Sequence, residues 1–199
     1  MNKKYILFGL ITICSITFTS CSQKDEKQIT KKEAALSAIY NRKSVRSFIK
    51  DRPVSDEDVQ ALIKAGMSAP SGKDTRPWEF VIINDRAILD KMAEELPTAK
   101  MLSQAPMAIV VCGDTIRSSY WYLDCSAATE NILLAAEAME LGGVWTAAYP
   151  YRDRMATVIK HTNMPAQVLP LAVIPIGYPM GNHSVKDKYD EKKIHMNKW

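Results

Sequence analysis

The stretch RSSYWYLDCSAATENILLAAEAMEL, residues 117–141, decides the fold that this sequence predicts. Apolar and small side chains recur in it every three or four positions, which is the period of one helix face; they are Trp121, Cys125, Ala128, Ile132, Ala135 and Met139. We therefore expect one helix over 117–141, ended by a left-handed cap at Gly142 and Gly143. At 1.5 Å per residue this helix would reach roughly 37 Å, longer than a small core requires. We expect something outside its own domain to cover it.

Two helices are predicted upstream. Thr30 with Glu33 forms a capping-box pattern that opens the first, and Ser55 with Asp58 repeats the signal before the second, which Pro70 ends. Spacings of three and four residues place the apolar positions on one side of each helix: Leu36, Ile39 and Tyr40 in the first, and Val59, Leu62, Ile63, Gly66 and Met67 in the second.

Short apolar runs alternate with these helices, and their near-continuous hydrophobicity is typical of strands buried on both faces. The expected strands are 80–83, 107–112, 144–148 and 171–176. Pro175 lies inside the last run, so we expect that strand to be an edge strand or to bend there. The sequence thus predicts one α+β domain over residues 31–199, with helices covering a sheet. Residues 181–199 form a polar C-terminal arm without a clear period.

Composition excludes several classes of protein. The chain has 199 residues, 47% of them hydrophobic, and 26 Lys and Arg against 22 Asp and Glu, for a formal charge of +4. This composition argues against a disordered chain, and the length is below the roughly 250 residues of a barrel enzyme. Two of the lysines lie in the first 20 residues, so the rest of the chain lacks the concentrated basic face of a nucleic-acid-binding domain.

The N-terminus has the pattern of a signal peptide over residues 1–20. Lys3 and Lys4 form a positive segment, and an apolar stretch at 5–17 follows, too short for a transmembrane helix of about 20 residues. Small residues then precede Cys21, as in a bacterial lipobox, although Phe18 stands where Leu is usual. We expect acylation of Cys21, a polar tether over 21–30, and a membrane-anchored lipoprotein of the cell envelope, on the periplasmic or surface side. Plain secretion and a retained anchor are the alternatives.

The remaining cysteines and histidines suggest neither a disulfide framework nor a metal site. Cys112 and Cys125 are the two cysteines of the folded body, without a CxxC pair, and the three histidines are scattered. The glycine fingerprints of the dinucleotide fold and of the P-loop are also missing. A nucleotide, if bound, must be held in another way.

Three clusters carry candidate chemistry. The stretch NRKSVRSF, residues 41–48, can bring two or three cations and a hydroxyl to a phosphate, although a solvated helix end would also attract cations. The stretch APSGKDTRPW, residues 69–78, offers a turn whose backbone a planar ligand could approach closely, or is an ordinary loop. The stretch GGVWTAAYP, residues 142–150, has small residues that would suit a flat ring, or is a buried strand.

In this order, and together with PIGYP at 175–179, these clusters resemble the FMN-dependent nitroreductase family from about Leu36 to the C-terminus. The resemblance implies a three-layer fold with a central, mostly antiparallel sheet. It also implies a homodimer that places two FMN molecules at the subunit interface and passes electrons from NAD(P)H to an acceptor. Such an interface would account for the long central helix.

The resemblance also implies residue roles in FMN binding. Arg42, Lys43 and Ser44 would hold the phosphate and ribityl chain, and Arg46 would reach the N1/O2 edge of the ring. A cation near N1 stabilises the anionic reduced flavin. Lys193, in the arm, matches a basic residue that the family brings to the phosphate.

The other implied contacts concern the ring. Pro70 and Ser71 would cover it from the partner subunit, and Gly72 of the same turn is a further expected FMN-binding residue. Thr146, Ala147 and Ala148 would supply backbone contacts near N5. Two positions depart from the family pattern: Asp74, where Asn is common, and Arg76, where Gln is usual. An ionised Asp can only accept hydrogen bonds, so the contact of Asp74 with the pyrimidine edge is in question.

No side chain stands out as a general acid or base, as expected where the cofactor carries the chemistry. The sequence leaves the acceptor open among nitroaromatics, quinones, free flavins and enones. Export also leaves the electron donor open. The alternatives are an exported flavin-binding or scavenging lipoprotein without turnover, and a reductive dehalogenase or flavin-fragmenting relative.

Overall fold

The computed structural model describes residues 29–199. The signal peptide predicted at 1–20 and the acylation predicted at Cys21 lie outside the described residues. Within residues 29–199, no helix is both long and apolar enough to cross a membrane.

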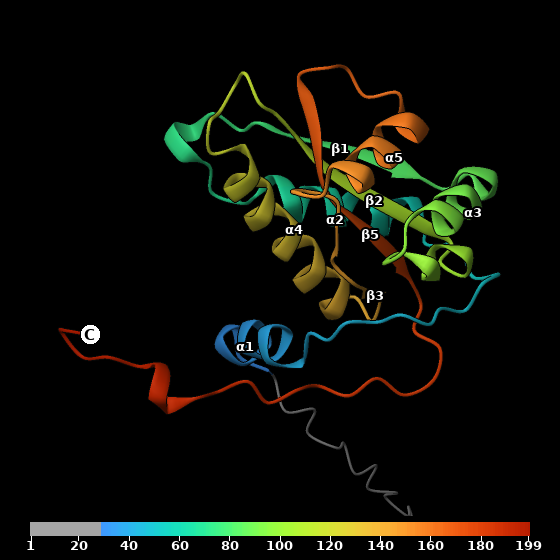
Figure 1. Ribbon diagram of the computed structural model, residues 1–199. Coiled ribbons are helices and arrows are strands. Elements are labelled where there is room, and N and C mark those ends of the chain that lie inside the picture. Colours follow the sequence, from blue (N-terminus) through green and yellow to red (C-terminus); the bar gives the residue numbers. More distant parts are fainter. Residues whose placement is uncertain (1–28) are drawn as a thin grey trace, which may run out of the picture.

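An antiparallel sheet forms the middle layer of the fold (Figure 1). Three long strands lie side by side in the order β1 (Trp78–Ile83), β2 (Met107–Asp114) and β5 (Val168–Gly177). Two short strands, β3 (Gly142–Gly143) and β4 (Thr146–Ala147), pair with the other side of β5. All four strand pairs are antiparallel, which confirms the predicted α+β class and the antiparallel sheet.

The prediction of an edge strand around Pro175 is wrong, because β5 has partners on both sides. On one side Pro175 lies opposite Ala108 of β2. On the other side β3 pairs only as far as Ile176 and β4 only from Val173, so Pro175 faces the interval between the two short strands. A residue without an N–H is tolerated where the ladder is interrupted. Of the strand predicted over 144–148, only β4 is present, and β3 lies just before that span.

Helices cover both faces of the sheet, which gives the three predicted layers (Figure 1). On one face α2 (Asp56–Met67) and α4 (Trp121–Ala138) pack against alternate residues of β2, including Ile109 and Val111. On the other face α3 (Arg86–Glu95), α5 (Arg152–Thr162) and the short η2 (Lys100–Ser103) cover Ala108 and Val110. Successive strand residues point to opposite faces, so one strand contributes to both cores.

The central helix is shorter than predicted, with 18 residues instead of the span 117–141. Its predicted buried face is confirmed at Trp121, Cys125, Ala128 and Ile132. The cap, however, uses Glu140 in the left-handed conformation, with a φ of 58°. The N–H of Leu141 donates to the carbonyl of Ala136 at 2.8 Å, and that of Glu140 donates to the carbonyl of Glu137 at 3.2 Å. These two bonds form a Schellman motif.

The glycine pair predicted as the cap forms β3 instead. A Cβ atom on Gly142 would lie 2.7 Å from the side chain of Val45, so the glycine permits close packing of the segment after α1. Gly142 is therefore required by the contact of β3 with the segment after α1. The sequence pattern of a helix end does not reveal such a contact between distant segments.

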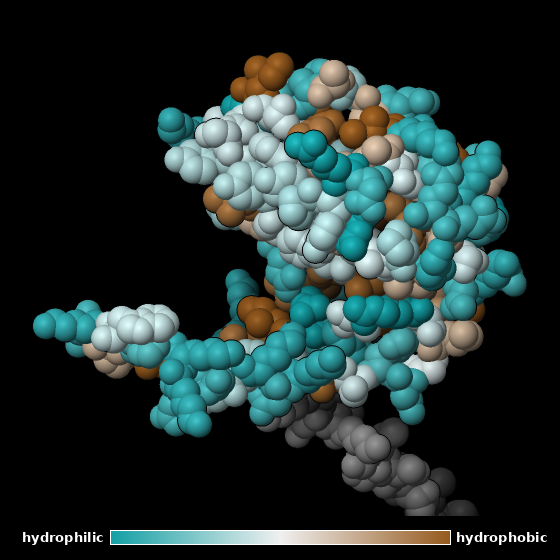
Figure 2. Space-filling view, viewed as in Figure 1, coloured by the Kyte–Doolittle hydropathy of each residue, from teal (hydrophilic) through white to brown (hydrophobic). Residues whose placement is uncertain are grey.

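Helix α1 (Lys31–Asn41) and the C-terminal arm project from this body (Figures 1 and 2). The predicted capping box is present: the Glu33 N–H donates to Thr30 Oγ1 at 3.2 Å, and the Thr30 N–H donates to Glu33 Oε2 at 2.9 Å. Helix α1 buries none of its residues, and Ile39 and Tyr40 are exposed. The arm carries one short helix, η3 (Glu191–Lys193).

Candidate functional site

The segment after α1 is held extended by two buried side chains. Val45 and Phe48 are each 1% exposed and anchor the segment in the core. The N–H of Val45 donates to the carbonyl of Gly143 at 3.0 Å, which ties the segment to β3. Ser44 and Arg46, on either side of Val45, are left exposed. The alternation of an extended chain therefore presents the polar residues of the RKSVR motif at the surface.

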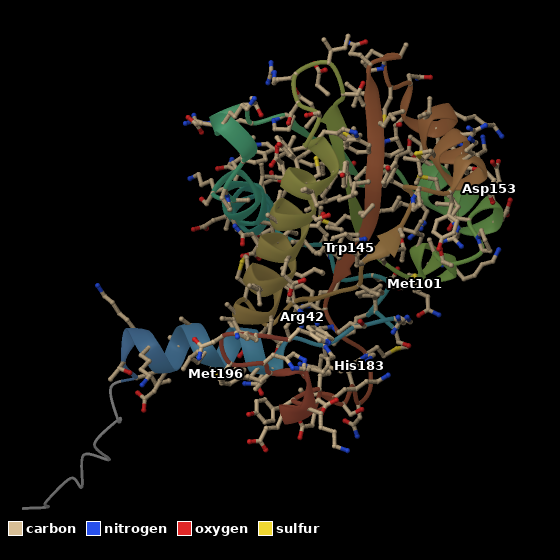
Figure 3. All side chains as sticks on the ribbon, turned by 60° about the vertical axis from the view of Figure 1, so that its left-hand side comes forward. Arg42, Met101, Trp145, Asp153, His183 and Met196 are labelled. Carbon is tan, nitrogen blue, oxygen red and sulfur yellow. The ribbon has the colours of Figure 1, made fainter. Side chains whose placement is uncertain are left out.

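A hollow of about 400 Å³ lies between this segment and the arm. Figure 3 shows Arg42 and His183 close together there, below the C-terminal end of α4. The hollow is lined by Arg42, Lys43, Ser44, Arg46, Asn182, His183, Ser184, Lys186 and Lys188. Lysine, arginine and hydroxyl groups are the donors that bind phosphate oxygens, and none of the described residues that line the hollow is acidic. It is therefore suited to an anion.

Two of these cations are paired with carboxylates on α4. Arg42 Nε lies 2.9 Å from Glu130 Oε1, and Lys43 Nζ lies 2.9 Å from Glu137 Oε1. The Lys43 ammonium also donates to Glu137 Oε2 at 3.1 Å. The cations predicted to bind phosphate are thus held against the body.

The predicted ring-covering turn lies near the other end of α4. It contains the short helix η1 (Gly72–Asp74), and the N–H of Gly72 donates to Asp124 Oδ1 at 2.8 Å. Asp124 is buried, and its other oxygen accepts from Ser118 Oγ at 3.3 Å. The turn is thereby fixed to the first turn of α4.

This turn has an unusual backbone. Lys73, Asp74 and Arg76 adopt the left-handed conformation, with φ values of 56°, 54° and 48°. Each such non-glycine residue costs roughly 1–2 kcal/mol. Ser71 Oγ accepts from the Arg76 N–H at 3.1 Å, and Thr75 Oγ1 donates to the Gly72 carbonyl at 3.0 Å. Strain of this kind is concentrated at binding sites, so the backbone of the turn marks it as a candidate ligand contact.

Asp74 and Arg76 are exposed and pair with each other. The hydrogen bonds from Arg76, and secondarily its charge, lower the pKa of the Asp74 carboxyl below its ordinary value. The same hydrogen bonds raise the pKa of Arg76. The Asp74 carboxylate is therefore ionised at neutral pH, and the Arg76 guanidinium balances its charge.

The third cluster lies in β4 and just after it. Thr146 is buried, and its hydroxyl donates to the Val173 carbonyl at 2.6 Å. The Ala148 N–H donates to the Leu171 carbonyl at 2.9 Å. The Ala147 carbonyl accepts from Arg154 Nη1 at 3.3 Å. The Thr146 hydroxyl and the Ala148 N–H are thus engaged within the sheet, and the predicted backbone contacts near N5 stay a prediction.

One chain brings only part of the predicted site together. Arg42, Lys43, Ser44 and Arg46 line one hollow. The turn at Pro70, Ser71, Gly72 and Asp74 is fixed to Asp124, which precedes Glu137 by 13 positions or about 20 Å along α4. Lys193 does not line the hollow, and its ammonium forms an ion pair with Asp190 at 3.8 Å. The turn does not line the hollow of its own chain, and its contribution from a partner subunit stays a prediction.

Sequence reasoning missed several residues of the hollow. Lys186 and Lys188 are two positions apart in an extended segment, a spacing that places side chains on one side. That pattern could have been noticed, whereas His183 gave no signal. Glu130 and Glu137 lie some 90 residues from their cations, and no local pattern predicts such pairs.

Comparison with known proteins places this chain among flavoenzymes. The family model described as "Nitroreductase family" matches residues 39–98 and 93–178. A relative from Methanothermobacter thermautotrophicus, with the provisional name NADH dehydrogenase/NAD(P)H nitroreductase, is 41% identical over 167 residues, which cover 82% of this chain and 87% of the relative.

Solved structures agree with this result. A crystal structure from Bacteroides thetaiotaomicron, with the same provisional name, is 62% identical and covers 83% of this chain and 98% of its own, with a TM-score of 0.82. A provisionally named nitroreductase from Desulfovibrio desulfuricans, solved in complex with FMN, is 28% identical and covers 83% of this chain and 97% of its own, with a TM-score of 0.71. The chain described here belongs to the nitroreductase family.

Proposed function

We propose that this protein is an FMN-dependent oxidoreductase that takes electrons from NAD(P)H and reduces a small organic acceptor, such as a nitroaromatic or a quinone. The observation that carries the proposal is the cationic hollow beside the RKSVR motif. The FMN complex of the relative from Desulfovibrio desulfuricans supports the choice of cofactor.

The residues of the hollow fit the phosphate end of FMN. Its lysine and arginine side chains match a dianionic group, and Ser44 adds a hydroxyl donor. Arg46 is exposed on the same segment and lines the same hollow. With the FMN phosphate bound by Arg42, Lys43 and Ser44, Arg46 is the residue that we assign to the N1/O2 edge of the flavin. Once bound, FMN supplies the hydride chemistry. The protein's own residues then bind, orient and tune the cofactor.

We also propose a homodimer with the FMN at its interface. Apolar side chains are exposed on α1, α4 and the arm, among them Tyr40, Leu123 and Met196. Large exposed apolar groups on neighbouring elements are typical of an interaction surface. A second copy would also bring a turn at residues 70–74 to each hollow, which a single chain does not do. Sedimentation at micromolar concentration tests this, and a stable monomer that retains FMN would contradict it.

For localisation, we propose a membrane-anchored lipoprotein of the cell envelope, attached through Cys21 on the periplasmic or surface side. The support is the signal-peptide pattern over residues 1–20 with a cysteine after it. Each buried CH₂ of a lipid chain contributes about 0.8 kcal/mol to membrane binding, so more than one chain gives lasting attachment. Whole-cell protein should partition into detergent and incorporate a fatty-acid probe, and Cys21→Ser should do neither. Unaltered protein free in the soluble periplasm would count against the anchor.

The cofactor assignment is tested by retention. Protein mixed with FMN and then desalted should keep the flavin absorbance. The charge reversal Arg42→Glu should weaken FMN binding by at least about tenfold, the worth of one charge-assisted hydrogen bond. The exposed Lys91→Glu on α3, on the opposite face of the sheet, is the control. Equal FMN affinity in the Arg42 variant and the control would contradict the assignment of the FMN phosphate to this hollow.

A further inference from the structure

The two carboxylates that face the hollow's cations come from one face of α4. Glu130 and Glu137 are seven positions apart, which is two turns of the helix. Glu130 pairs with Arg42 and Glu137 with Lys43, the two residues that directly follow α1. An acidic side chain beside an anion site would by electrostatics alone weaken anion binding. A carboxylate beside each of the two cations therefore needs a physical reason.

The geometry leaves donors for a ligand. An ammonium group has three N–H donors, and Lys43 Nζ uses two of them on Glu137, at 2.9 and 3.1 Å. One donor remains. Arg42 Nε lies 2.9 Å from Glu130 Oε1, and within residues 29–199 neither Nη atom of Arg42 forms a hydrogen bond. The four N–H groups on these two atoms are therefore left for other partners. Both pairs thus fix a cationic head without using all its donors.

Burial makes the Lys43 pair the more restrictive one. The side chains of Lys43 and Glu137 are 24% and 16% exposed, whereas Glu130 is 46% exposed. Exposed ion pairs between long side chains fix little. A lysine held by both oxygens of an enclosed carboxylate has already lost much of its rotamer freedom, so less is lost when an anion binds.

We propose that Glu137 is a positioning residue for the anion site. It holds Lys43 Nζ through both carboxylate oxygens, so that the remaining N–H is available to the phosphate in the hollow. Glu130 acts on Arg42 in the same way, with a weaker hold. The inference rests on the proposed function, because it takes the phosphate of FMN as the anion.

The two explanations of Glu137 predict opposite signs. If the carboxylate only competed with the phosphate for Lys43, its neutralisation would tighten FMN binding. If it positions Lys43, Glu137→Gln should weaken FMN binding even though the site becomes more positive. Riboflavin has the same ring without a phosphate, so its binding reports on everything except this contact.

The test measures dissociation constants for FMN and riboflavin by flavin fluorescence. We expect Glu137→Gln to weaken FMN binding about tenfold, the worth of one hydrogen bond to a charged group, and to leave riboflavin binding within about twofold. Glu140→Gln is the matched control, because Glu140 lies at the same end of α4, is exposed, and has no ion pair within residues 29–199. In a Lys43→Ala background, Glu137→Gln should have no further effect on FMN.

Three results would overturn the inference. FMN binding that tightens or stays unchanged would make Glu137 a competitor or a bystander. Equal weakening of FMN and riboflavin binding would mean that the pair only holds the segment after α1 against α4. If Glu137→Gln does not fold, Glu130→Gln should show a smaller loss of FMN binding with unchanged riboflavin binding, and its absence would count equally against the inference. Failure of the unaltered protein to bind FMN would instead refute the proposed function, and the inference with it.

Discussion

Asp74 and Arg76 bind each other through both oxygens of the carboxylate: Oδ1 lies 2.7 Å from Nε, and Oδ2 lies 2.7 Å from Nη2. These are the two positions at which the sequence departs from the Asn and Gln usual in the nitroreductase pattern. The structure shows the two departures as one unit. The charge introduced at position 74 is balanced at position 76, and the guanidinium supplies the N–H donors that an ionised Asp lacks.

The first prediction is that these two residues are coupled in FMN binding. Arg76→Gln alone leaves an unbalanced carboxylate in the turn, and Asp74→Asn alone leaves an unbalanced guanidinium. The double variant has the usual neutral pair. We expect each single variant to bind FMN more weakly than the double variant, as measured by FMN titration of the four proteins of a double-mutant cycle. Additive effects of the two substitutions would show that the positions act independently.

The second prediction concerns the titration of Asp74. Because the Arg76 hydrogen bonds lower its pKa in the folded protein, the pair's contribution is present at neutral pH and is lost only as the pH falls through that lowered pKa. Arg76→Gln should therefore move the Asp74 pKa upward, toward its ordinary value. A carboxyl-carbon NMR titration of Asp74 measures this directly. An unchanged pKa in Arg76→Gln would mean that the pair does not persist in solution.

The third prediction concerns the support of the left-handed turn. Asp124→Ala removes the buried acceptor of the Gly72 N–H, and leaving such a group unpaired costs about 1–3 kcal/mol. We expect the free energy of unfolding in denaturant to fall by that amount. Asp124→Asn keeps an acceptor oxygen at the same place and should lose less. Equal stability of the two variants would argue against this hydrogen bond.

The fourth prediction is that the body thiols are inert in the folded protein. Burial raises the pKa of Cys112 to about 12, and burial also raises that of Cys125. Both residues are free thiols, and it is the thiolate that reacts. With Cys14 and Cys21 replaced by serine, a thiol reagent at pH 8 should label the native protein at neither position and the unfolded protein at both. Rapid labelling of the native protein would refute the burial of these side chains.

Local patterns predicted much of the fold. The caps at Thr30 and Ser55 are present, with the Glu33 and Asp58 N–H groups bonded to their side chains. The three long strands were predicted too, because buried strands are continuously apolar. In contrast, the cap of α4 uses Glu140, and a non-glycine left-handed residue has no sequence signature. Helix α5 was not predicted. It buries only Val158 fully, so its sequence shows little apolar periodicity.

The candidate site was predicted where one segment carries it and missed where two segments meet. The RKSVR motif is contained in one extended segment, so its residue types could be recognised in the sequence. Its partners Glu130 and Glu137 were not predictable, because they become neighbours of Arg42 and Lys43 only when the segment after α1 lies beside α4. The pairing of Asp74 with Arg76 required a left-handed backbone that the sequence does not indicate.

The central claim is that this chain binds FMN and passes electrons from NAD(P)H through it. The most direct measurement is an anaerobic titration of the desalted, FMN-loaded protein with NADH and, separately, with NADPH, followed by the visible absorbance of the flavin. The account predicts that the flavin survives desalting, is bleached by at least one of the two donors, and recovers its absorbance when a quinone or nitroaromatic is added. A flavin that stays bound yet remains oxidised with both donors would contradict the claim and favour a flavin-binding protein without turnover.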